Sequence, residues 1–72
     1  MTQPQLHNRV KQARVEKNLS QIELADRVGV TRQTISSIET NRYCPSTLLA
    51  LLLARVLDKP VESLFYLEGE SP

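Results

Sequence analysis

The 72-residue sequence contains few of the residues on which many folds and sites depend. It has one cysteine, Cys44, one histidine, His7, and two glycines. A single cysteine excludes an intramolecular disulfide, and together with a single histidine it leaves no plausible zinc site. The scarcity of glycine, without alternating apolar runs joined by Asn-Gly or Asp-Gly, argues against an all-β domain. We expect His7 to be a surface residue and Cys44 a neutral loop residue, with a redox role for Cys44 as the alternative.

Long hydrophobic runs and targeting signals are also lacking. The longest apolar run, residues 48–54, is too short to span a bilayer, and the N-terminus has no basic-then-apolar signal pattern. There is no Ser/His/Asp set, paired-carboxylate pocket or phosphate-cradling glycine loop. These absences predict a cytoplasmic protein that is not an enzyme and uses no cofactor and no metal.

The composition that remains is that of one small globular domain. Hydrophobic residues make up 40% of the chain, which is too many for a disordered one, and we expect a single domain over residues 1–72. The net charge of +1 is distributed unevenly: residues 1–43 carry seven basic and four acidic side chains, and residues 44–72 carry two and four. The basic first half favours an anionic partner, although a solvated surface gives the same pattern.

Capping residues predict two short helices joined by a tight turn. The first helix of the chain, capped by Asn8, is expected to end near Lys17. Then Ser20 and Glu23 form a capping box for a helix that ends near Val28 at a glycine. Thr31 follows almost at once and caps a helix to about residue 40. Two short helices joined so tightly must cross steeply, which is helix-turn-helix geometry over about residues 20–40.

The C-terminal half predicts two more helices. Ser46 caps a helix over residues 47–57, and Pro60 suits the first turn of a short helix over residues 61–64. Residues 65–67 can form a brief extended strand. The predicted fold class is all-α, with five helices, the helix-turn-helix at the second and third, and a short extended segment at the termini.

The third predicted helix has an unusual outward face. On a helical wheel, Thr31, Ile35 and Ile38 form the buried stripe, with Thr34 and Glu39 at its edges. A solvated helix face prefers Glu, Lys and Ala, but a face of arginine, glutamine and small hydroxyl residues fits the DNA major groove. The arc opposite the buried stripe has this composition: it consists of Arg32, Gln33, Ser36, Ser37 and Thr40. The alternative is that these side chains only solubilise the helix.

Residues 10–65 resemble the phage-repressor-like helix-turn-helix family, also called the xenobiotic-response-element type. The segment LSQIELADRVGVTRQTISSIE carries most of the similarity, and LARVLDKPVESLF extends it. The resemblance implies a transcriptional regulator, most often a repressor, that binds a near-palindromic double-stranded operator as a homodimer. One departure is Thr40-Asn41, where the family often has Asn-Gly.

Motif positions of the family imply roles for individual residues. Arg14 and Glu39 match a structural pair that joins the first helix to the third. For Tyr43, packing on the third helix is the alternative to a phosphate contact. The implied base-reading residues are Arg32, Gln33, Ser36 and Ser37, and the implied phosphate-binding residues are Gln21, Thr31, Thr34, Arg42 and Tyr43.

The predicted fourth helix has almost no polar side. Nine of the eleven residues from 47 to 57 are apolar, so the helix must be covered on nearly all sides. A second copy of the chain could provide part of the cover; alternatively, residues 65–67 fold back over the helix. A rival function is an antitoxin or other protein-interaction module that uses DNA only for autoregulation. The candidate dimer residues are Leu48, Leu52, Val61, Leu64 and Leu67.

Overall fold

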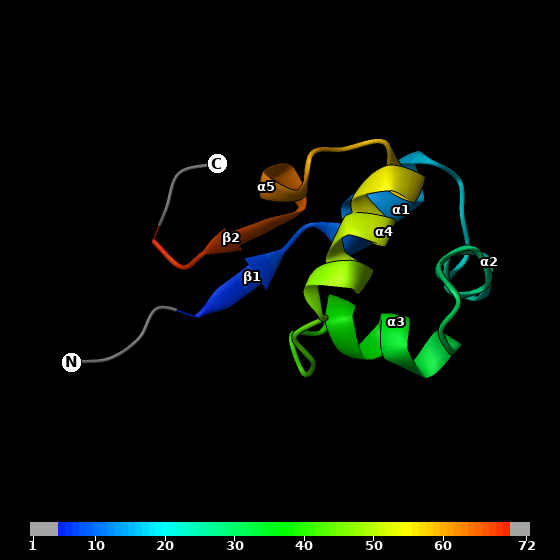
Figure 1. The fold of residues 1–72 in the computed structure, drawn as a ribbon, viewed down its shortest axis with the longest axis horizontal. Coiled ribbons are helices and arrows are strands. Elements are labelled where there is room, and N and C mark those ends of the chain that lie inside the picture. The colour runs from blue at the N-terminus through cyan, green and yellow to red at the C-terminus, as the bar shows by residue number, and fades with distance from the viewer. Residues whose placement is uncertain (1–4, 70–72) are drawn as a thin grey trace.

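The computed structural model of the chain describes residues 5–69. In that part the chain forms five helices and one two-stranded sheet (Figure 1). The predicted all-α class with a helix-turn-helix is therefore confirmed, with a small strand pair added. In chain order the elements are β1 (Leu6–Asn8), α1 (Val10–Glu16), α2 (Gln21–Val28), α3 (Arg32–Glu39), α4 (Thr47–Leu57), α5 (Val61–Leu64) and β2 (Phe65–Leu67).

Helix starts follow the predicted caps, with one correction. The capping box is present: Ser20 Oγ accepts from the Glu23 amide at 3.0 Å, and Glu23 Oε1 accepts from the Ser20 amide at 2.9 Å. The N-cap residues of α3 and α4 are Thr31 and Ser46, as predicted. For α1 the N-cap residue is Arg9, but the Asn8 side chain still accepts from the amide of Val10 at 3.1 Å. Asn8 therefore caps α1 from one residue further out.

Four helices of the described chain are followed by a residue in the left-handed backbone conformation. Gly29 ends α2 with φ 78°, and Asn18 and Asn41 adopt φ values of 57° and 61°. Asp58 at the end of α4 has φ 56° and was not predicted. Asn and Asp tolerate this region better than other residues with a Cβ.

One hydrophobic core joins the five helices. Ile35 and Ile38 of α3 are both fully buried, which confirms the apolar stripe of that helix. Thr31 is exposed and not part of the stripe, because an N-cap residue lies outside the helical path. The remaining core residues are Val10, Ala13, Leu19, Leu24, Ala25, Val28, Leu49, Leu53, Ala54, Leu57 and Leu64.

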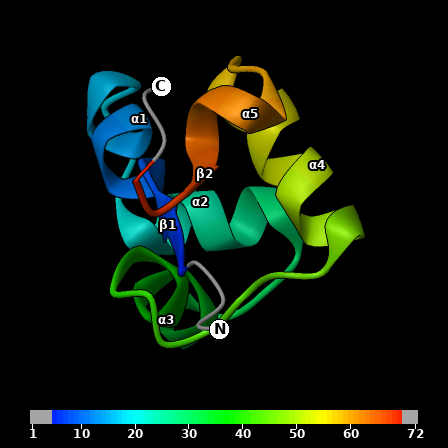
Figure 2. The same cartoon turned by 90° about the vertical axis from the view of Figure 1, so that its left-hand side faces the viewer.

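The sheet joins the two ends of the described chain. β1 and β2 are antiparallel, with Leu6 opposite Leu67, His7 opposite Tyr66, and Asn8 opposite Phe65. Figure 2 looks from the side of the sheet, where β1 lies between α1 and α3. Phe65 packs against the core and so attaches the sheet to the helices. The strand over residues 65–67 was predicted, but its partner was not.

Helix α4 is only partly covered by its own chain. Leu48 and Leu51 are 68% and 54% exposed, although four other residues of the helix are buried. Because Leu48 stays mostly exposed, residues 65–67 do not cover it, and the fold-back alternative is wrong for this residue. Among the helices of residues 5–69, none is both long and apolar enough to cross a membrane.

Candidate nucleic-acid interface

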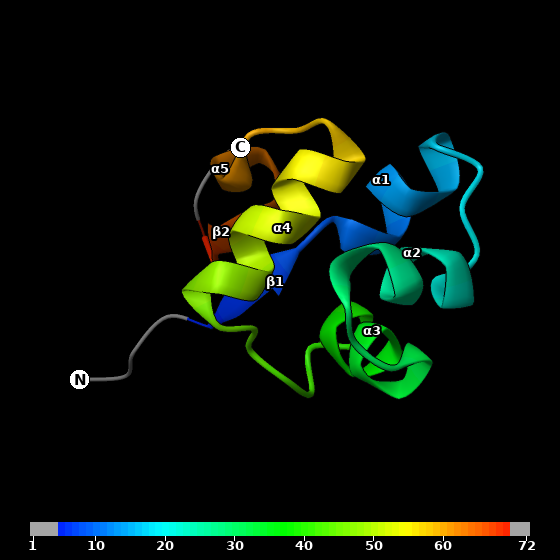
Figure 3. The same cartoon turned by 45° about the vertical axis from the view of Figure 1, so that its right-hand side comes forward.

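Helices α2 and α3 are joined by three residues, 29–31, and pack closely against each other. The positive φ of Gly29 turns the chain, and the Val30 amide donates to the Ala25 carbonyl at 3.0 Å to close the end of α2. Figure 3 shows the two helices stacked beside α4, with α3 on the outside. This arrangement is the helix-turn-helix that the sequence predicts, and it leaves one side of α3 open to solvent.

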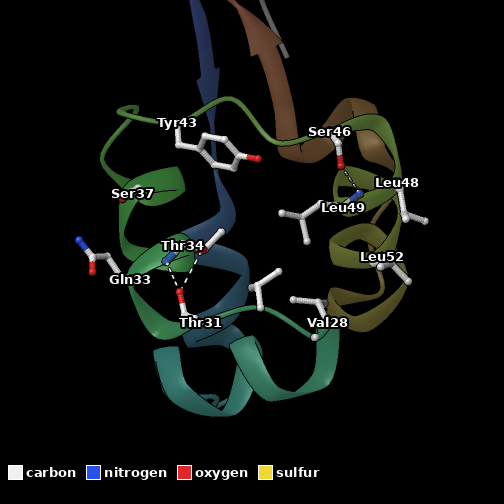
Figure 4. Close-up of a pocket in the computed structure, with 12 residues that line it drawn as sticks. Val28, Thr31, Gln33, Thr34, Ser37, Tyr43, Ser46, Leu48, Leu49 and Leu52 are labelled. Carbon is white, nitrogen blue, oxygen red and sulfur yellow. Dashed lines mark hydrogen bonds between the residues drawn. The ribbon is translucent and has the colours of Figure 1, made fainter.

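The open side of α3 carries the predicted base-reading residues. Arg32 and Gln33 are exposed, whereas Ser36 and Ser37 are half-buried. In Figure 4 the Gln33 side chain points away from the body of the protein. An exposed arginine can donate two hydrogen bonds to guanine, and an exposed glutamine can bond an adenine edge with both its donor and its acceptor. The two serines are small enough for the helix to approach a groove closely.

The two threonines at the start of α3 bind each other. Thr31 Oγ1 accepts from the Thr34 amide at 3.2 Å, and the two hydroxyl oxygens are 3.0 Å apart (Figure 4). Only one hydroxyl can donate across that contact, so the proton of the other is free to donate elsewhere. A phosphate contact by one of the two residues stays a prediction compatible with this geometry.

The predicted pair Arg14 and Glu39 is brought together across the interior side of α3. Arg14 Nε lies 2.7 Å from Glu39 Oε2, and the two side chains are 12% and 3% exposed. Arg14 Nη2 contacts Glu39 Oε1 at 3.4 Å, and Arg14 Nη1 donates to the Leu19 carbonyl at 2.8 Å. A charged pair with so little solvent access holds its partners in one geometry more than it adds stability. The pair therefore fixes how α3 is set against α1.

Gln21 makes a contact within the protein that was not predicted. Its Nε2 donates to Glu39 Oε1 at 3.0 Å, so the side-chain amide binds a carboxylate of the protein where a phosphate contact was expected. The reason is that the almost buried carboxylate needs donors on both oxygens, and the start of α2 faces the second one. The backbone amide of Gln21 lies in the first turn of α2, where amides have no intrahelical acceptor. A phosphate contact of Gln21, through this amide or through its side chain, remains a prediction.

Arg42 and Tyr43 follow α3 in a fixed turn. Their amides donate to the Ser37 carbonyl at 2.8 and 3.2 Å. Arg42 is exposed, and Tyr43 is 47% exposed. In Figure 4 the Tyr43 ring lies over the space between α3 and α4, so it neither packs fully on α3 nor points wholly into solvent.

A groove of about 690 Å³ separates α3 from α4. Thr34 and Ser37 line its α3 side, and Leu48, Leu49 and Leu52 line its α4 side (Figure 4). The groove thus places an apolar wall next to the helix with the predicted base-reading residues.

The remaining candidate dimer residues are not all on the surface. Leu67 is 39% exposed, and Leu52 and Val61 are half-buried against the core. Leu64 is 1% exposed and belongs to the core. Its side chain therefore offers no surface to a partner, because α5 turns it into the core.

Asn8 makes a contact to α3 that sequence analysis missed. It was predicted only as a helix cap, but its Nδ2 also donates to the carbonyl of Ile38 at 2.8 Å. The two residues are 30 positions apart, and the only local signal was an asparagine directly before a helix. Nothing in such a signal indicates what the second end of the amide binds.

The fold and the exposed side of α3 define a helix-turn-helix DNA-binding domain. A family model described as helix-turn-helix matches residues 10–64, and the chain belongs to this family, as the resemblance of its sequence predicted. The described domain is thus of the kind found in transcriptional regulators.

Individual relatives agree with the family. The chain is 42% identical over 66 residues to the uncharacterized HTH-type transcriptional regulator YgzD of Bacillus subtilis, covering 92% of this chain and all of the relative. It is 48% identical over 62 residues to an uncharacterized HTH-type transcriptional regulator of Methanothermobacter thermautotrophicus, covering 85% and 90% of the two chains. These are names of transcriptional regulators, not of enzymes.

A solved structure shows the same fold. The restriction-modification controller protein C.AhdI from Aeromonas hydrophila superimposes with a TM-score of 0.70 at 30% identity. The match covers 75% of this chain and 82% of the controller protein.

Proposed function

We propose that the protein is a sequence-specific repressor that binds a near-palindromic operator as a homodimer, with α3 in the major groove. One short helix, α3, has both an exposed first turn that can form hydrogen bonds, at Arg32 and Gln33, and an almost buried side chain, Glu39, that anchors it. This combination is the observation that carries the proposal. A helix that reads base edges must present its side chains at a set angle, and the anchor provides that angle.

Base and phosphate contacts divide along the chain. Arg32, Gln33, Ser36 and Ser37 read base edges from α3. The DNA backbone on either side of these bases is held by Thr31 or Thr34, by Arg42 and Tyr43, and by the amide of Gln21. Since phosphate contacts position a protein and base contacts specify its site, the two sets have different effects on specificity.

The homodimer is supported by the exposed apolar side of α4. Leu48 and Leu51, with Leu67 of β2, are large apolar side chains that the described chain leaves 39–68% exposed. A two-fold dimer would place two copies of α3 about 34 Å apart, which corresponds to one turn of DNA and a near-palindromic site. The controller protein that shares the fold is a regulator by its name, which agrees with this role.

The proposal is tested by selecting bound sites from random duplex DNA and then measuring affinity by fluorescence anisotropy. At a physiological salt concentration, the selected duplex should bind at least about 10³-fold more tightly than a scrambled duplex of the same composition. The selected sequence should be near-palindromic. Equal affinity for both duplexes would show that the protein does not recognise a sequence.

A second candidate function follows from the same apolar side of α4. In this alternative, Leu48 and Leu51 bind a different protein, as an antitoxin does, and DNA binding serves only autoregulation. A purified chain that is monomeric and recognises its selected site only when that protein is added would favour the alternative. A dimer that recognises the site alone favours the repressor.

A further inference from the structure

We infer that Asn8 is a positioning residue for DNA binding. From its place in the β1–β2 sheet it binds the turn after α3, and this turn fixes the positions of Arg42 and Tyr43. This inference rests on the proposed function, in which these two residues contact phosphates. Asn8 itself stays at the back of α3 and touches no DNA in this arrangement.

The side-chain amide of Asn8 links three elements. Its Oδ1 accepts from the Val10 amide at the start of α1, at 3.1 Å. Its Nδ2 donates to the carbonyl of Ile38 in the last turn of α3, at 2.8 Å, and to Asn41 Oδ1, at 2.9 Å. The orientation of the amide is set by this chemistry, because the reverse orientation would place the oxygen against the Ile38 carbonyl. Both protons of the Asn8 side-chain amide are therefore donated to acceptors at the end of α3.

The turn that Asn8 holds leads directly to the proposed phosphate contacts. Asn41 has φ 61°, and its backbone amide also donates to the Ile38 carbonyl, at 3.0 Å. The next two amides, of Arg42 and Tyr43, donate to the Ser37 carbonyl. A displacement of Asn41 is thus passed on to the residues after it, because the same turn fixes all three.

The terminal sheet gives Asn8 its own fixed position. Asn8 lies opposite Phe65 in the sheet, and the Arg9 amide donates to the Leu64 carbonyl at 2.8 Å. The Tyr66 ring stacks on His7 with centroids 5.6 Å apart, and the Arg9 guanidinium lies 4.0 Å from the same ring. β1 is therefore held against β2 and the core, and it transmits that position to α3 through Asn8.

The variant Asn8→Asp separates the two roles of this side chain. Aspartate caps a helix as well as asparagine does, so the start of α1 is kept. The carboxylate has no proton for Ile38 and faces its carbonyl oxygen, which belongs to the helix and cannot turn away. The matched control is Asn18→Asp, the same chemical change at the exposed left-handed end of α1, which adds the same negative charge away from α3.

The experiment measures operator affinity at several salt concentrations for the full chain. Asn8→Asp should bind the selected duplex about fivefold more weakly than Asn18→Asp, as expected for the loss of hydrogen bonds in the holding turn. Its slope of log affinity against log salt should be smaller by about 1, because one phosphate contact is lost. A general loss of stability would not change that slope. Equal affinities and slopes for the two variants would overturn the inference.

A double-mutant cycle with Arg42→Ala supplies the second test. If Asn8 acts through the turn, Asn8→Asp should weaken binding much less when Arg42 is already alanine. Additive effects would overturn the inference. Asn41→Gly is the second variant if Asn8→Asp does not fold. Glycine keeps the positive φ and removes the side chain that binds Asn8 and also contacts His7 of the same strand, so it should lower affinity in the same direction. Unchanged affinity for Asn41→Gly would contradict the inference, whereas a wild-type chain without sequence preference would overturn the proposed function itself.

Discussion

Arg14 on α1 and Glu39 on α3 form an ion pair of 2.7 Å although they are 25 positions apart in the sequence. The carboxylate is also bound by Gln21 of α2, so one side chain of α3 is held by both of the preceding helices. The orientation of α3 is therefore fixed from inside the protein, on the side opposite its exposed residues.

Removing Glu39 should destabilise the fold strongly. Glu39→Ala leaves the Arg14 guanidinium little exposed and without its partner, which costs about 3 kcal/mol of the unfolding free energy. Urea unfolding followed by circular dichroism measures the loss. The control is Glu16→Ala, which removes the more exposed pair to Lys59 and should cost less than about 1 kcal/mol. Equal losses for the two variants would show that Glu39 has no special role.

Substitutions on the open side of α3 should change DNA recognition but not stability. Arg32→Ala and Gln33→Ala should each weaken specific binding by about 1–3 kcal/mol and relax the preference at one base position. Anisotropy titrations against single-base variants of the selected site measure both effects. Arg55→Ala, which removes an exposed arginine from α4, is the charge-matched control. A uniform loss across all sequences would instead assign the two residues to phosphate.

The apolar side of α4 should be needed for dimers. Leu48 is 68% exposed, so Leu48→Asp should leave the monomer folded and put a charge where the partner would pack. We expect this variant to sediment as a monomer at concentrations where the wild type is a dimer. Val15→Asp, an equally drastic change at a 55% exposed position of α1, should leave the dimer intact. A dimeric Leu48→Asp variant would place the interface elsewhere.

The capping box at the start of α2 should make stability depend on acid pH. The Ser20 backbone amide, then the Ser20 hydroxyl and more weakly Arg27, lower the pKa of Glu23 below its ordinary value of 4.5. Since the folded state favours the carboxylate, its stabilising effect is present above the ordinary pKa and is lost as the pH falls through the lowered one. Glu23→Gln, which cannot ionise, should lack this component. The difference in unfolding free energy between wild type and variant should therefore shrink from pH 7 to pH 3, and a constant difference would contradict the assignment.

Local signals were sufficient for most of the fold. Ser20, Thr31 and Ser46 predicted helix starts because an N-cap acts on amides two or three residues away, and Gly29 predicted an end for a similarly local reason. The β1–β2 sheet could be predicted only in part, because each strand has three residues and its partner lies at the other end of the described chain. Short strands carry too little alternation to indicate a partner.

The candidate site shows the same division. The exposure of Arg32 and Gln33 followed from the helical period, which is a local property. The contacts of Gln21 with Glu39 and of Asn8 with Ile38 depend on how helices pack, so residue type alone could not assign them. Leu64 was misplaced because a four-residue helix is too short for its period to show which side is inward.

The pairing of β1 with β2 has a consequence for how the protein matures during synthesis. The last strand leaves the ribosome only after all five described helices, and β1 has no strand partner until then. Joining chain segments so far apart is slow compared with the formation of local helical contacts. The helix-turn-helix can thus fold before the sheet is complete, and the strand that carries Asn8, which binds α3 at Ile38, is fully paired only when Leu67 has been added.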